Sequence, residues 1–414
     1  MRITTFLDDI DDSAKSSTVL DRFAKSIIHK LLRGLKDCTL IIQENGQTYV
    51  FGDSAESGNP LKATIQVLKP GFYRAALLKG SIGSAEAYLS GIWKTDDLTN
   101  VIRIFSRNID HMNSMDSGFT SLLTVFDRIK HKLAANTLTQ SRKNIQAHYD
   151  LSNAFFELFL DKKMMYSSAV FPHSQSDLDQ ASDFKLKLLA QNLELNENHH
   201  VVEIGTGWGG MAIYLASNYG CKVTTTTISD AQRQYALQKV EENNLQHLVT
   251  VLDQDYRKLQ GKFDRLISVE MIEAVGHEYF SEFFKVCNNL VKPGGRMVLQ
   301  AITIPEQRYD AARKSVDFIQ RYIFPGGCLL STQVILENMG KHTEFQIENL
   351  RDIGLDYAAT LRIWRDRFFN NIEAVESLGF DNVFKRLWEF YLCYCEGGFQ
   401  EKAITAVQVS FRKA

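Results

Sequence analysis

The last two thirds of the chain alternate short apolar runs with longer amphipathic stretches. The apolar runs HVVEI, KVTTTTI, LVTVLDQD, FDRLISVEMI and GRMVLQAITI begin at residues 200, 222, 248, 263 and 295. Such an alternation predicts strands and helices in turn, the pattern of a parallel sheet covered on both faces. The tail KAITAVQVSFRK predicts a late strand that pairs with FQIENLRDI at 345–353. We therefore expect a doubly wound, mainly parallel α/β sheet.

The first third of the chain follows other patterns. A basic amphipathic helix is predicted over 20–35, where apolar residues recur at helical spacing: Leu20, Phe23, Ala24, Ile27, Ile28, Leu31, Leu32 and Leu35. Packing on its own domain or on a partner subunit is favoured over docking on a membrane, and both remain open. The run CTLIIQENGQTYVF predicts a hairpin that turns at Asn45 and Gly46. The basic stretch 128–144 reads as a linker, so we expect an α+β domain over 1–135 and a second domain over 136–414.

A glycine-rich turn follows the strand that begins at residue 200. Glycines at 205, 207 and 210 satisfy GxGxxG, which alone is weak evidence for a dinucleotide site. Glu203 just before the turn would repel a pyrophosphate but could pair with the amino group of S-adenosylmethionine. A dinucleotide site would also have an acidic residue for the ribose at the end of the second strand, but that strand ends VTTTTIS with no carboxylate before Asp230. The turn thus favours S-adenosylmethionine over a dinucleotide, and a purely structural turn is the remaining alternative.

Ligands of such sheets bind at the carboxyl ends of the strands. Polar residues at these ends are candidates for binding, each with a solvated loop position as its alternative: Thr227, Ser229, Gln254, Asp255, Glu270 and Glu273.

Composition narrows the function classes. The net charge of -2 and the lack of a DPPY-like or NPPY-like motif give no reason to expect a nucleic-acid partner. Six scattered cysteines lack the paired spacing of zinc sites, so we expect no metal and reduced thiols in a cytoplasmic protein. The N-terminus is acidic and no run approaches the about 18 apolar residues of a membrane span. A membrane substrate would be reached from the cytoplasmic side by a peripherally associated protein.

Several segments resemble the cyclopropane-fatty-acyl-phospholipid synthase family: HYDLSNAFFELFLDKKMMYSSAVF, VVEIGTGWGG, SVEMIEAVGHEYF, SVDFIQRYIFPGGCLLS, DYAATLRIWRDRF and EFYLCYCEGGF. The resemblance covers the chain from His148 onward, and GSIGSAEAYLSGIWKTDDLTNVIRI resembles the N-terminal domain of longer members. It implies a seven-stranded, Rossmann-like methyltransferase sheet with a smaller N-terminal domain and a lipid-site insertion around 303–331. It also implies transfer of a methyl group from S-adenosylmethionine to a cis double bond in a phospholipid acyl chain, giving a cyclopropane.

An isolated alkene is a poor nucleophile, so such a site must exclude water and hold the double bond against the methyl donor. Aromatic side chains suit both a lipid tail and a carbocation, although most are expected to be simple core. The candidates lie in or near the motifs: Phe155, Phe156, Tyr166, Phe171, Phe318, Tyr322 and Phe324.

The resemblance also implies a bound bicarbonate that takes the proton from the cation. Its ligands would be Glu273, Tyr357 and the backbone of Ile302, with Ser168 and Gln300 where the family has cysteine and histidine. Either residue can still hydrogen-bond an oxyanion. These replacements keep open a methylene or methyl-branched product, and also a non-catalytic lipid-binding protein or a small-molecule methyltransferase. A homodimer is a further open alternative.

For the cofactor, the resemblance implies contacts at Tyr166, Ser167, Gly205, Gly207, Thr227 and Gln232. Gln254 and Asp255 would lie near the adenine. Tyr149 would close over the site, with packing at a helix start as its alternative.

Overall fold

The computed structural model describes residues 18–53, 61–115 and 151–414. Contacts divide the chain into two compact units, each made of three segments. Unit 1 comprises 1–130, 315–323 and 376–403, and unit 2 comprises 131–314, 324–375 and 404–414. The predicted second domain over 136–414 includes 315–323 and 376–403, whereas in the structure these two segments group with the N-terminal part. Tyr149 and the predicted basic linker at 128–144 lie outside the described residues.

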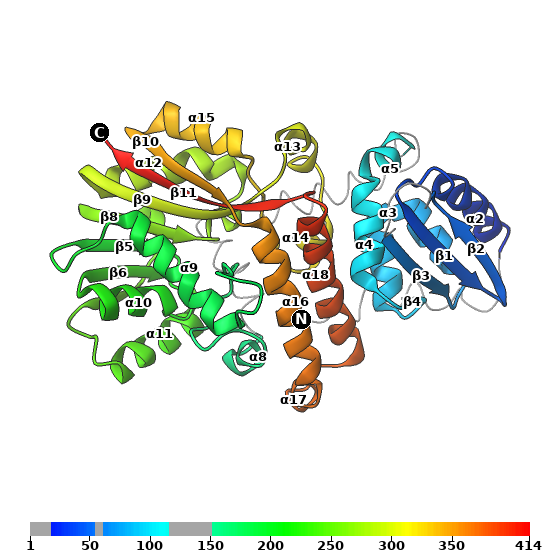
Figure 1. The fold of residues 1–414 in the computed structure, drawn as a ribbon, viewed down its shortest axis with the longest axis horizontal. Coiled ribbons are helices and arrows are strands. Elements are labelled where there is room, and N and C mark those ends of the chain that lie inside the picture. Colours follow the sequence, from blue (N-terminus) through cyan, green and yellow to red (C-terminus); the bar gives the residue numbers. More distant parts are fainter. Residues whose placement is uncertain (1–17, 54–60, 116–150) are drawn as a thin grey trace. The chain divides into compact units, whose positions relative to one another are not determined.

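Unit 1 is built around a four-stranded sheet in the order β2-β1-β3-β4 (Figure 1). Its strands are β1 (Cys38–Glu44), β2 (Gln47–Phe51), β3 (Leu61–Val67) and β4 (Trp93–Thr95). Its helices are α2 (Val19–Leu32), α3 (Gly71–Leu89), α4 (Leu98–Arg107), α5 (Ile109–Met115), α14 (Phe318–Tyr322) and α18 (Asn382–Gln400). The predicted hairpin is confirmed, because β1 and β2 pair antiparallel and Asn45 and Gly46 both have positive φ.

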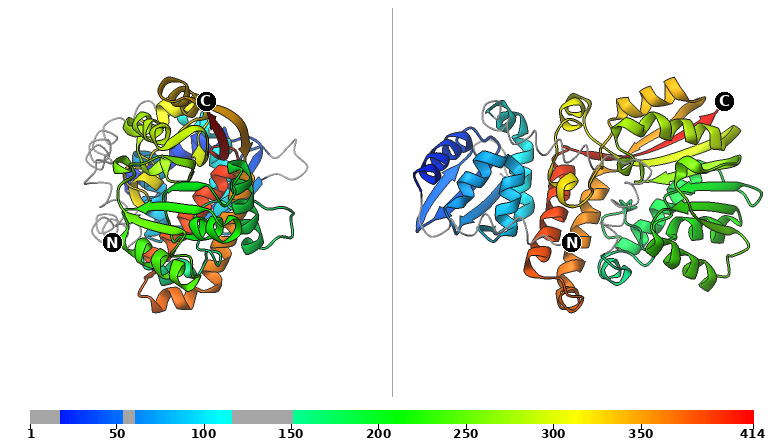
Figure 2. Two further views of the ribbon diagram at one scale, coloured as in Figure 1. Left: turned by 90° about the vertical axis from the view of Figure 1, so that its left-hand side faces the viewer. Right: turned by 180° about the vertical axis from the view of Figure 1, so that it is seen from behind.

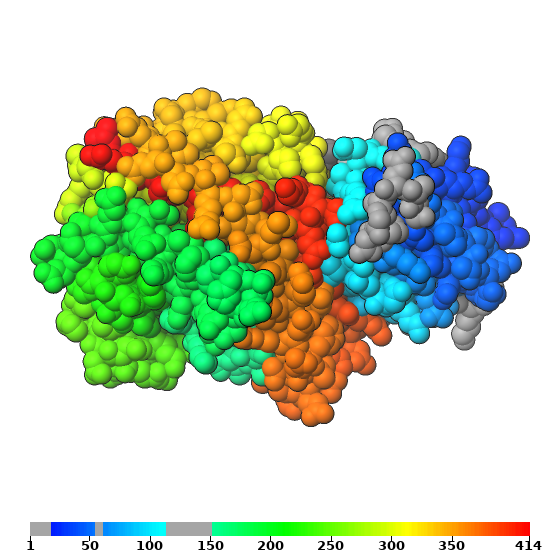
Figure 3. Space-filling model, viewed as in Figure 1, coloured from blue at the N-terminus to red at the C-terminus, as the bar shows by residue number. Residues whose placement is uncertain are grey.

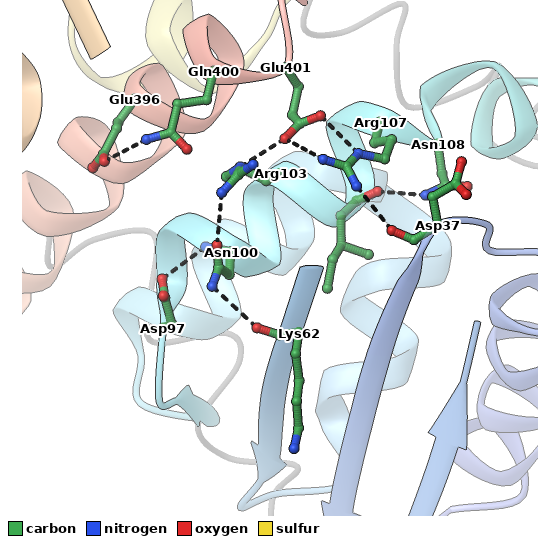
Figure 4. A network of polar contacts seen from close by, with 11 residues as sticks. Asp37, Lys62, Asp97, Asn100, Arg103, Arg107, Asn108, Glu396, Gln400 and Glu401 are labelled. Carbon is green, nitrogen blue, oxygen red and sulfur yellow. Dashed lines mark hydrogen bonds and ion pairs between the residues drawn. The ribbon is translucent and has the colours of Figure 1, made fainter. Parts of the chain in front are cut away.

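The predicted helix over 20–35 is present as α2, but only part of its apolar stripe is buried. Ala24, Leu32 and the following Leu35 are buried, whereas Leu20 and Phe23 are 49% and 55% exposed. In Figure 4, α4 and α18 are joined by Glu401, which accepts hydrogen bonds from Arg103 at 2.7 Å and Arg107 at 2.9 Å. Both contacts link residues almost 300 positions apart in the chain.

Unit 2 contains a seven-stranded sheet in the order β10-β11-β9-β8-β5-β6-β7. The strands are β5 (His200–Ile204), β6 (Lys222–Thr227), β7 (Val249–Asp253), β8 (Phe263–Val269), β9 (Val291–Thr303), β10 (Phe345–Asp352) and β11 (Thr405–Lys413). The first five pair parallel, and β10 and β11 add antiparallel strands at one side. The predicted doubly wound fold, including the pairing of the tail strand with 345–353, is confirmed.

Helices cover both faces of this sheet (Figures 1 and 2). Val201 and Val202 are neighbours on β5 but belong to two different apolar cores, because successive strand residues point to opposite faces. One core includes residues of α9 (Leu178–Leu193), α10 (Gly210–Tyr219) and α11 (Asp230–Glu242). The other includes residues of α12 (Phe280–Leu290) and α15 (Thr332–His342). The sheet is thus buried on both sides, which leaves its strand ends to form a site.

The remaining elements of the described chain connect these layers. They are the helices α8 (Asn153–Glu157), α13 (Glu306–Ala312), α16 (Gly354–Asn370) and α17 (Ile372–Ser377), with the 3-10 turns η2 (Tyr256–Lys258), η3 (Ile272–Ala274) and η4 (His277–Tyr279). Among the described residues, no helix combines the length and apolarity needed to cross a bilayer.

Candidate active site

The predicted glycine turn joins β5 to α10. Gly205 and Gly207 have φ values of 102° and 52°, a left-handed backbone that glycine adopts without strain. A Cβ added at Gly207 would meet no protein atom within 4 Å. The turn therefore leaves open space beside the first amides of α10, where a ligand can approach the backbone.

Glu203 lies on β5 just before this turn and is buried, with 3% of its surface exposed. Burial raises the pKa of its carboxyl to about 8, against the opposing effects of Thr225 and Lys185. Its Oε2 has no hydrogen-bond partner within the described chain. A buried carboxylate oxygen without a partner is costly, and a cationic amino group would satisfy it. This site therefore fits the amino end of S-adenosylmethionine.

The next two strand ends carry the other predicted cofactor residues. Thr227 Oγ1 donates to Gln232 Oε1 at 3.2 Å, and Ser229 caps α11 by accepting from the Gln232 amide at 3.3 Å. These three residues thus lie together at the start of α11. After β7, the Gln254 side chain donates to the Lys258 carbonyl at 2.6 Å, and Asp255 pairs with Arg257 at 2.7 Å. Both side chains are engaged locally, and their predicted place near the adenine stays a prediction.

Three polar groups converge on the carboxylate of Glu270, which follows β8. The Tyr357 hydroxyl donates to Oε2 at 2.6 Å, and Gln300 Nε2 and the Ser168 amide donate to Oε1 at 2.7 and 2.9 Å. Burial raises the pKa of Glu270 above the ordinary glutamate value, and these three hydrogen bonds and the charge of Lys185 offset only part of the rise. Sequence analysis nominated Glu270 only as one of several strand-end residues.

The resemblance assigns Tyr357, Gln300 and Ser168 to a bicarbonate, but here they bind the side chain of Glu270. The Ser168 hydroxyl is also turned elsewhere, because it donates to the Ala169 carbonyl at 2.8 Å. A second anion would meet the same donors only by displacing a carboxylate, and the two negative charges would repel. The donor set therefore does not fit the predicted bicarbonate.

Glu273 was expected to share the anion site with Tyr357, and the structure gives it a different partner. Its Oε1 accepts from the backbone amide of Ile302, and its Oε2 has no hydrogen-bond partner within the described residues. Burial, followed by the charge of Glu270, raises the pKa of Glu273 to about 8. Glu273 is thus held near Glu270 with its pKa raised, and the Ile302 amide, predicted to bind the bicarbonate, donates to Glu273 instead.

Two groups near Glu270 were not predicted from the sequence. Lys185 on α9 is fully buried and donates to Ser167 Oγ at 2.9 Å. It falls at helical spacing among buried Leu178, Ala181 and Leu189, so a lysine within an apolar stripe was a usable signal. Gln408 on β11 donates to Gln300 Oε1 at 2.9 Å and so orients the Gln300 amide toward Glu270. No sequence pattern indicates that second contact.

Aromatic rings gather beside Tyr357 in unit 2. The Tyr166 ring centroid lies 5.3 Å from Trp364 and 6.4 Å from Phe324, and Trp364 lies 6.2 Å from Tyr357. Phe155 and Phe156 are fully buried core residues. Phe318 and Tyr322 belong to unit 1, where Phe318 packs on Phe390 at 4.6 Å.

Residues 136–409 match the sequence pattern described as mycolic acid cyclopropane synthetase. The chain belongs to this family. It is 35% identical over 368 residues to tuberculostearic acid methyltransferase UfaA1 of Mycobacterium tuberculosis, covering 87% of this chain and 86% of that protein. It is also 35% identical over 355 residues to cyclopropane-fatty-acyl-phospholipid synthase of Escherichia coli, covering 85% and 88%.

A solved structure of mycolic acid cyclopropane synthase CmaA1 with SAH and CTAB has a TM-score of 0.62 at 28% identity. The similarity covers 66% of this chain and 98% of that one. The chain is accordingly an S-adenosylmethionine-dependent methyltransferase, and its relatives methylate or cyclopropanate unsaturated lipid chains. The roles of its individual site residues are proposals.

Proposed function

We propose that this enzyme transfers the methyl group of S-adenosylmethionine to a cis double bond in the acyl chain of a membrane phospholipid. We further propose that Glu270 is the base that takes the proton from the resulting carbocation. Glu270 is proposed as the base because Tyr357, Gln300 and Ser168 all donate hydrogen bonds to its carboxylate. A carboxylate fixed by three donors is oriented as a base before the substrate arrives.

S-adenosylmethionine supplies an electrophilic methyl group when bound. The residues proposed to hold it are Glu203 at its amino group and the backbone around Gly205 and Gly207, with Ser167 and the Thr227–Gln232 region beside them. Charge supports this orientation, because the Glu203 carboxylate would attract the cationic amino group of S-adenosylmethionine. Tyr166, Trp364 and Phe324 would border the acyl chain with apolar ring surface.

The chemical balance requires one base. The alkene π electrons form the new carbon–carbon bond, the sulfonium carbon–sulfur bond breaks, and a cation is left on the neighbouring chain carbon. Glu270 then accepts a proton from the transferred methyl group, and the freed electron pair closes the cyclopropane ring. If a hydride first shifts to the cationic carbon, loss of the same proton leaves a methylene. A methyl-branched chain would require a further step in which a reductase adds a hydride and a proton to that methylene.

A base supplied by the chain itself also accounts for Ser168 and Gln300, the positions where the family has cysteine and histidine. Gln300 donates one amide hydrogen to Glu270 and accepts from Gln408, so its orientation is fixed on both sides. A histidine could hold a proton there, whereas glutamine only orients the base. We therefore propose that the family's bicarbonate is replaced here by Glu270.

The decisive test exchanges Glu270 for glycine. Glu270 has a φ of 48°, so glycine fits its backbone without strain and leaves room at the three donors. We expect Glu270→Gly to lose turnover by about two orders of magnitude or more, as for loss of a general base. Added bicarbonate or formate should restore part of it. Glu270→Gln keeps the volume and should not respond to either anion.

Lipids from cells that express each variant would show the reaction as a mass gain of one methylene unit. Gas chromatography of the acyl chains would separate a cyclopropane from a methylene product. A fully active Glu270→Gln enzyme would remove Glu270 from the mechanism. If Glu270→Gly loses turnover and neither bicarbonate nor formate restores any of it, Glu270 would have a structural role instead.

A further inference from the structure

Lys185 is buried without any exposed surface in the middle of α9. The buried residues at helical spacing from it include the apolar Leu178, Ala181 and Leu189, together with Ser182. Burying an ammonium costs several kcal/mol unless nearby negative charge and hydrogen bonds offset the loss of water. The side chain therefore needs a compensating environment, and three carboxyl groups supply it.

These carboxyl groups come from different elements around the ammonium. Their charges raise the pKa of Lys185 in the order Glu270, Asp161 and Glu203, although burial outweighs them and lowers it to about 8. Asp161 precedes the segment that carries Ser167, and it fixes that segment by accepting from the Lys163 and Met165 amides at 2.9 Å each. Lys185 thus faces a cofactor-side carboxyl on β5 and a base-side carboxyl after β8.

Lys185 also reaches Glu270 through the chain itself. Its ammonium donates to Ser167 Oγ at 2.9 Å, and the next residue, Ser168, donates its amide to Glu270 Oε1 at 2.9 Å. One side chain is therefore linked to the base both by charge and by a fixed two-residue segment.

We propose that Lys185 is a positioning residue for methyl transfer, which holds the Ser167–Ser168 segment against Glu270 and supplies a positive charge that favours the ionised form of this carboxylate. The proposal rests on the proposed role of Glu270 as the base. Its hydrogen bond is to Ser167 Oγ, and its action on Glu270 passes through the Ser168 amide and through charge.

The charge effect has a defined sign at Glu270. Within the part of the chain that the structure describes, the groups that act on this carboxylate are Lys185 from α9, Tyr357 from α16, Gln300 from β9, the Ser168 amide and the like charge of Glu273. Of these, Lys185 is the cation. Without it, the desolvated carboxylate is disfavoured relative to its protonated form, so its pKa rises. A protonated Glu270 cannot accept the proton, and turnover should then require higher pH.

The test compares Lys185→Met and Lys185→Gln with Lys187→Met. Gln keeps a hydrogen-bond donor for Ser167 without the charge, and Lys187 is an exposed lysine two residues along the same helix. The titration of Glu270 is followed by infrared difference spectroscopy against Glu270→Gln, and the pH profile of turnover is measured in parallel. We expect both Lys185 variants to move the Glu270 titration and the acidic limb upward by about one pH unit or more. Lys187→Met should move neither.

An unchanged Glu270 titration in both Lys185 variants would overturn the proposal, even if thermal stability falls. If Lys185→Met does not fold, Lys185→Gln alone carries the measurement, since it replaces a buried side chain with one that can still bind Ser167. Different results would refute the role of Glu270 as the base and the role of Lys185 in positioning it. An active Glu270→Gln enzyme would refute the base, whereas the infrared titration reports the charge of Lys185 without turnover.

Discussion

Tyr357 donates its phenolic hydrogen to Glu270 Oε2 over 2.6 Å, which joins α16 to the end of β8. Hydrogen bonds to a charged acceptor stabilise it by roughly 1.5–3 kcal/mol. The Tyr357 hydroxyl therefore favours the ionised form of Glu270, the form that the proposed reaction needs.

Replacing Tyr357 with phenylalanine should lower kcat by about tenfold to a hundredfold, the factor that corresponds to such a hydrogen bond. The acidic limb of the pH profile should also move upward, because the carboxylate loses a donor. Tyr235→Phe is a suitable control, since Tyr235 also donates to a carboxylate, Glu157, but at an exposed position. Equal turnover in the wild type and Tyr357→Phe would show that two donors suffice.

Cofactor affinity should depend on pH through Glu203. Burial raises its pKa to about 8, so the carboxyl of the free protein is largely protonated at pH 7. A cationic amino group binds the ionised form, and ionising the carboxyl costs about 1.4 kcal/mol per pH unit below its pKa. Calorimetry should thus show SAH affinity rising up to about tenfold per unit between pH 6.5 and 8. Glu203→Gln should bind weakly with little pH dependence, and an equal pH dependence there would exclude Glu203 as the source.

Gly207→Val should reduce SAH affinity by roughly a hundredfold or more, about 2.7 kcal/mol. A side chain at Gly207 meets no protein atom, so it would occupy the space proposed for the ligand. Its φ of 52° adds backbone strain, which Gly294→Val controls because Gly294 has a φ of 73° and equally open surroundings. Unchanged SAH affinity in Gly207→Val would argue against this turn as the cofactor site.

The ion pairs of Glu401 should stabilise unit 1. Burial raises the pKa of Glu401, but hydrogen bonds from Arg107 and Arg103 outweigh it and the pKa is lowered. The contribution is present above the ordinary glutamate pKa and is lost as pH falls through the lowered value. Glu401→Gln should cost about 1–2 kcal/mol at pH 7, given the partial exposure of both arginines.

Urea unfolding of the full chain would measure this difference. Below the lowered pKa of Glu401, wild type and Glu401→Gln should have nearly the same free energy of unfolding. Glu376→Gln, which breaks the exposed pair with Lys385, should change stability little at either pH. A difference that persists at low pH would point to packing of the side chain instead of its charge.

The exposed apolar residues at the start of α2 allow a test of the predicted docking of this helix on a membrane. Leu20 and Phe23 are about half exposed, and the start of this helix is dark blue on the surface of unit 1 in Figure 3. If it docks on lipid, binding to phosphatidylglycerol vesicles should weaken with salt and be weaker on neutral vesicles. Leu20→Ser with Phe23→Ser should lose a further roughly 1–3 kcal/mol of apolar burial. Val50→Ser, at a 64% exposed residue elsewhere in unit 1, is the control.

Much of the fold of unit 2 could be predicted because its strands are apolar runs and its turns are marked by glycine. The site was harder to predict. Glu270 and Glu273 lie three residues apart and both follow β8, so spacing alone could not decide which one Tyr357 reaches. The answer depends on the left-handed backbone at Glu270 and on contacts with α16 and β9, which bring together residues distant in the chain. Lys185 was overlooked for a different reason: a charged residue on a helix is usually exposed.

The grouping of 315–323 and 376–403 with unit 1 has a consequence for biosynthesis. A domain that is complete in its first 130 residues could fold while the ribosome still translates the rest. Unit 1 cannot, because α18 and the Glu401 that binds Arg103 and Arg107 are made almost 300 residues after α4. Its α4 surface therefore stays uncovered until α18 has been made, a period in which exposed apolar surface invites aggregation. Unit 1 thus finishes folding only after most of unit 2 has been synthesised.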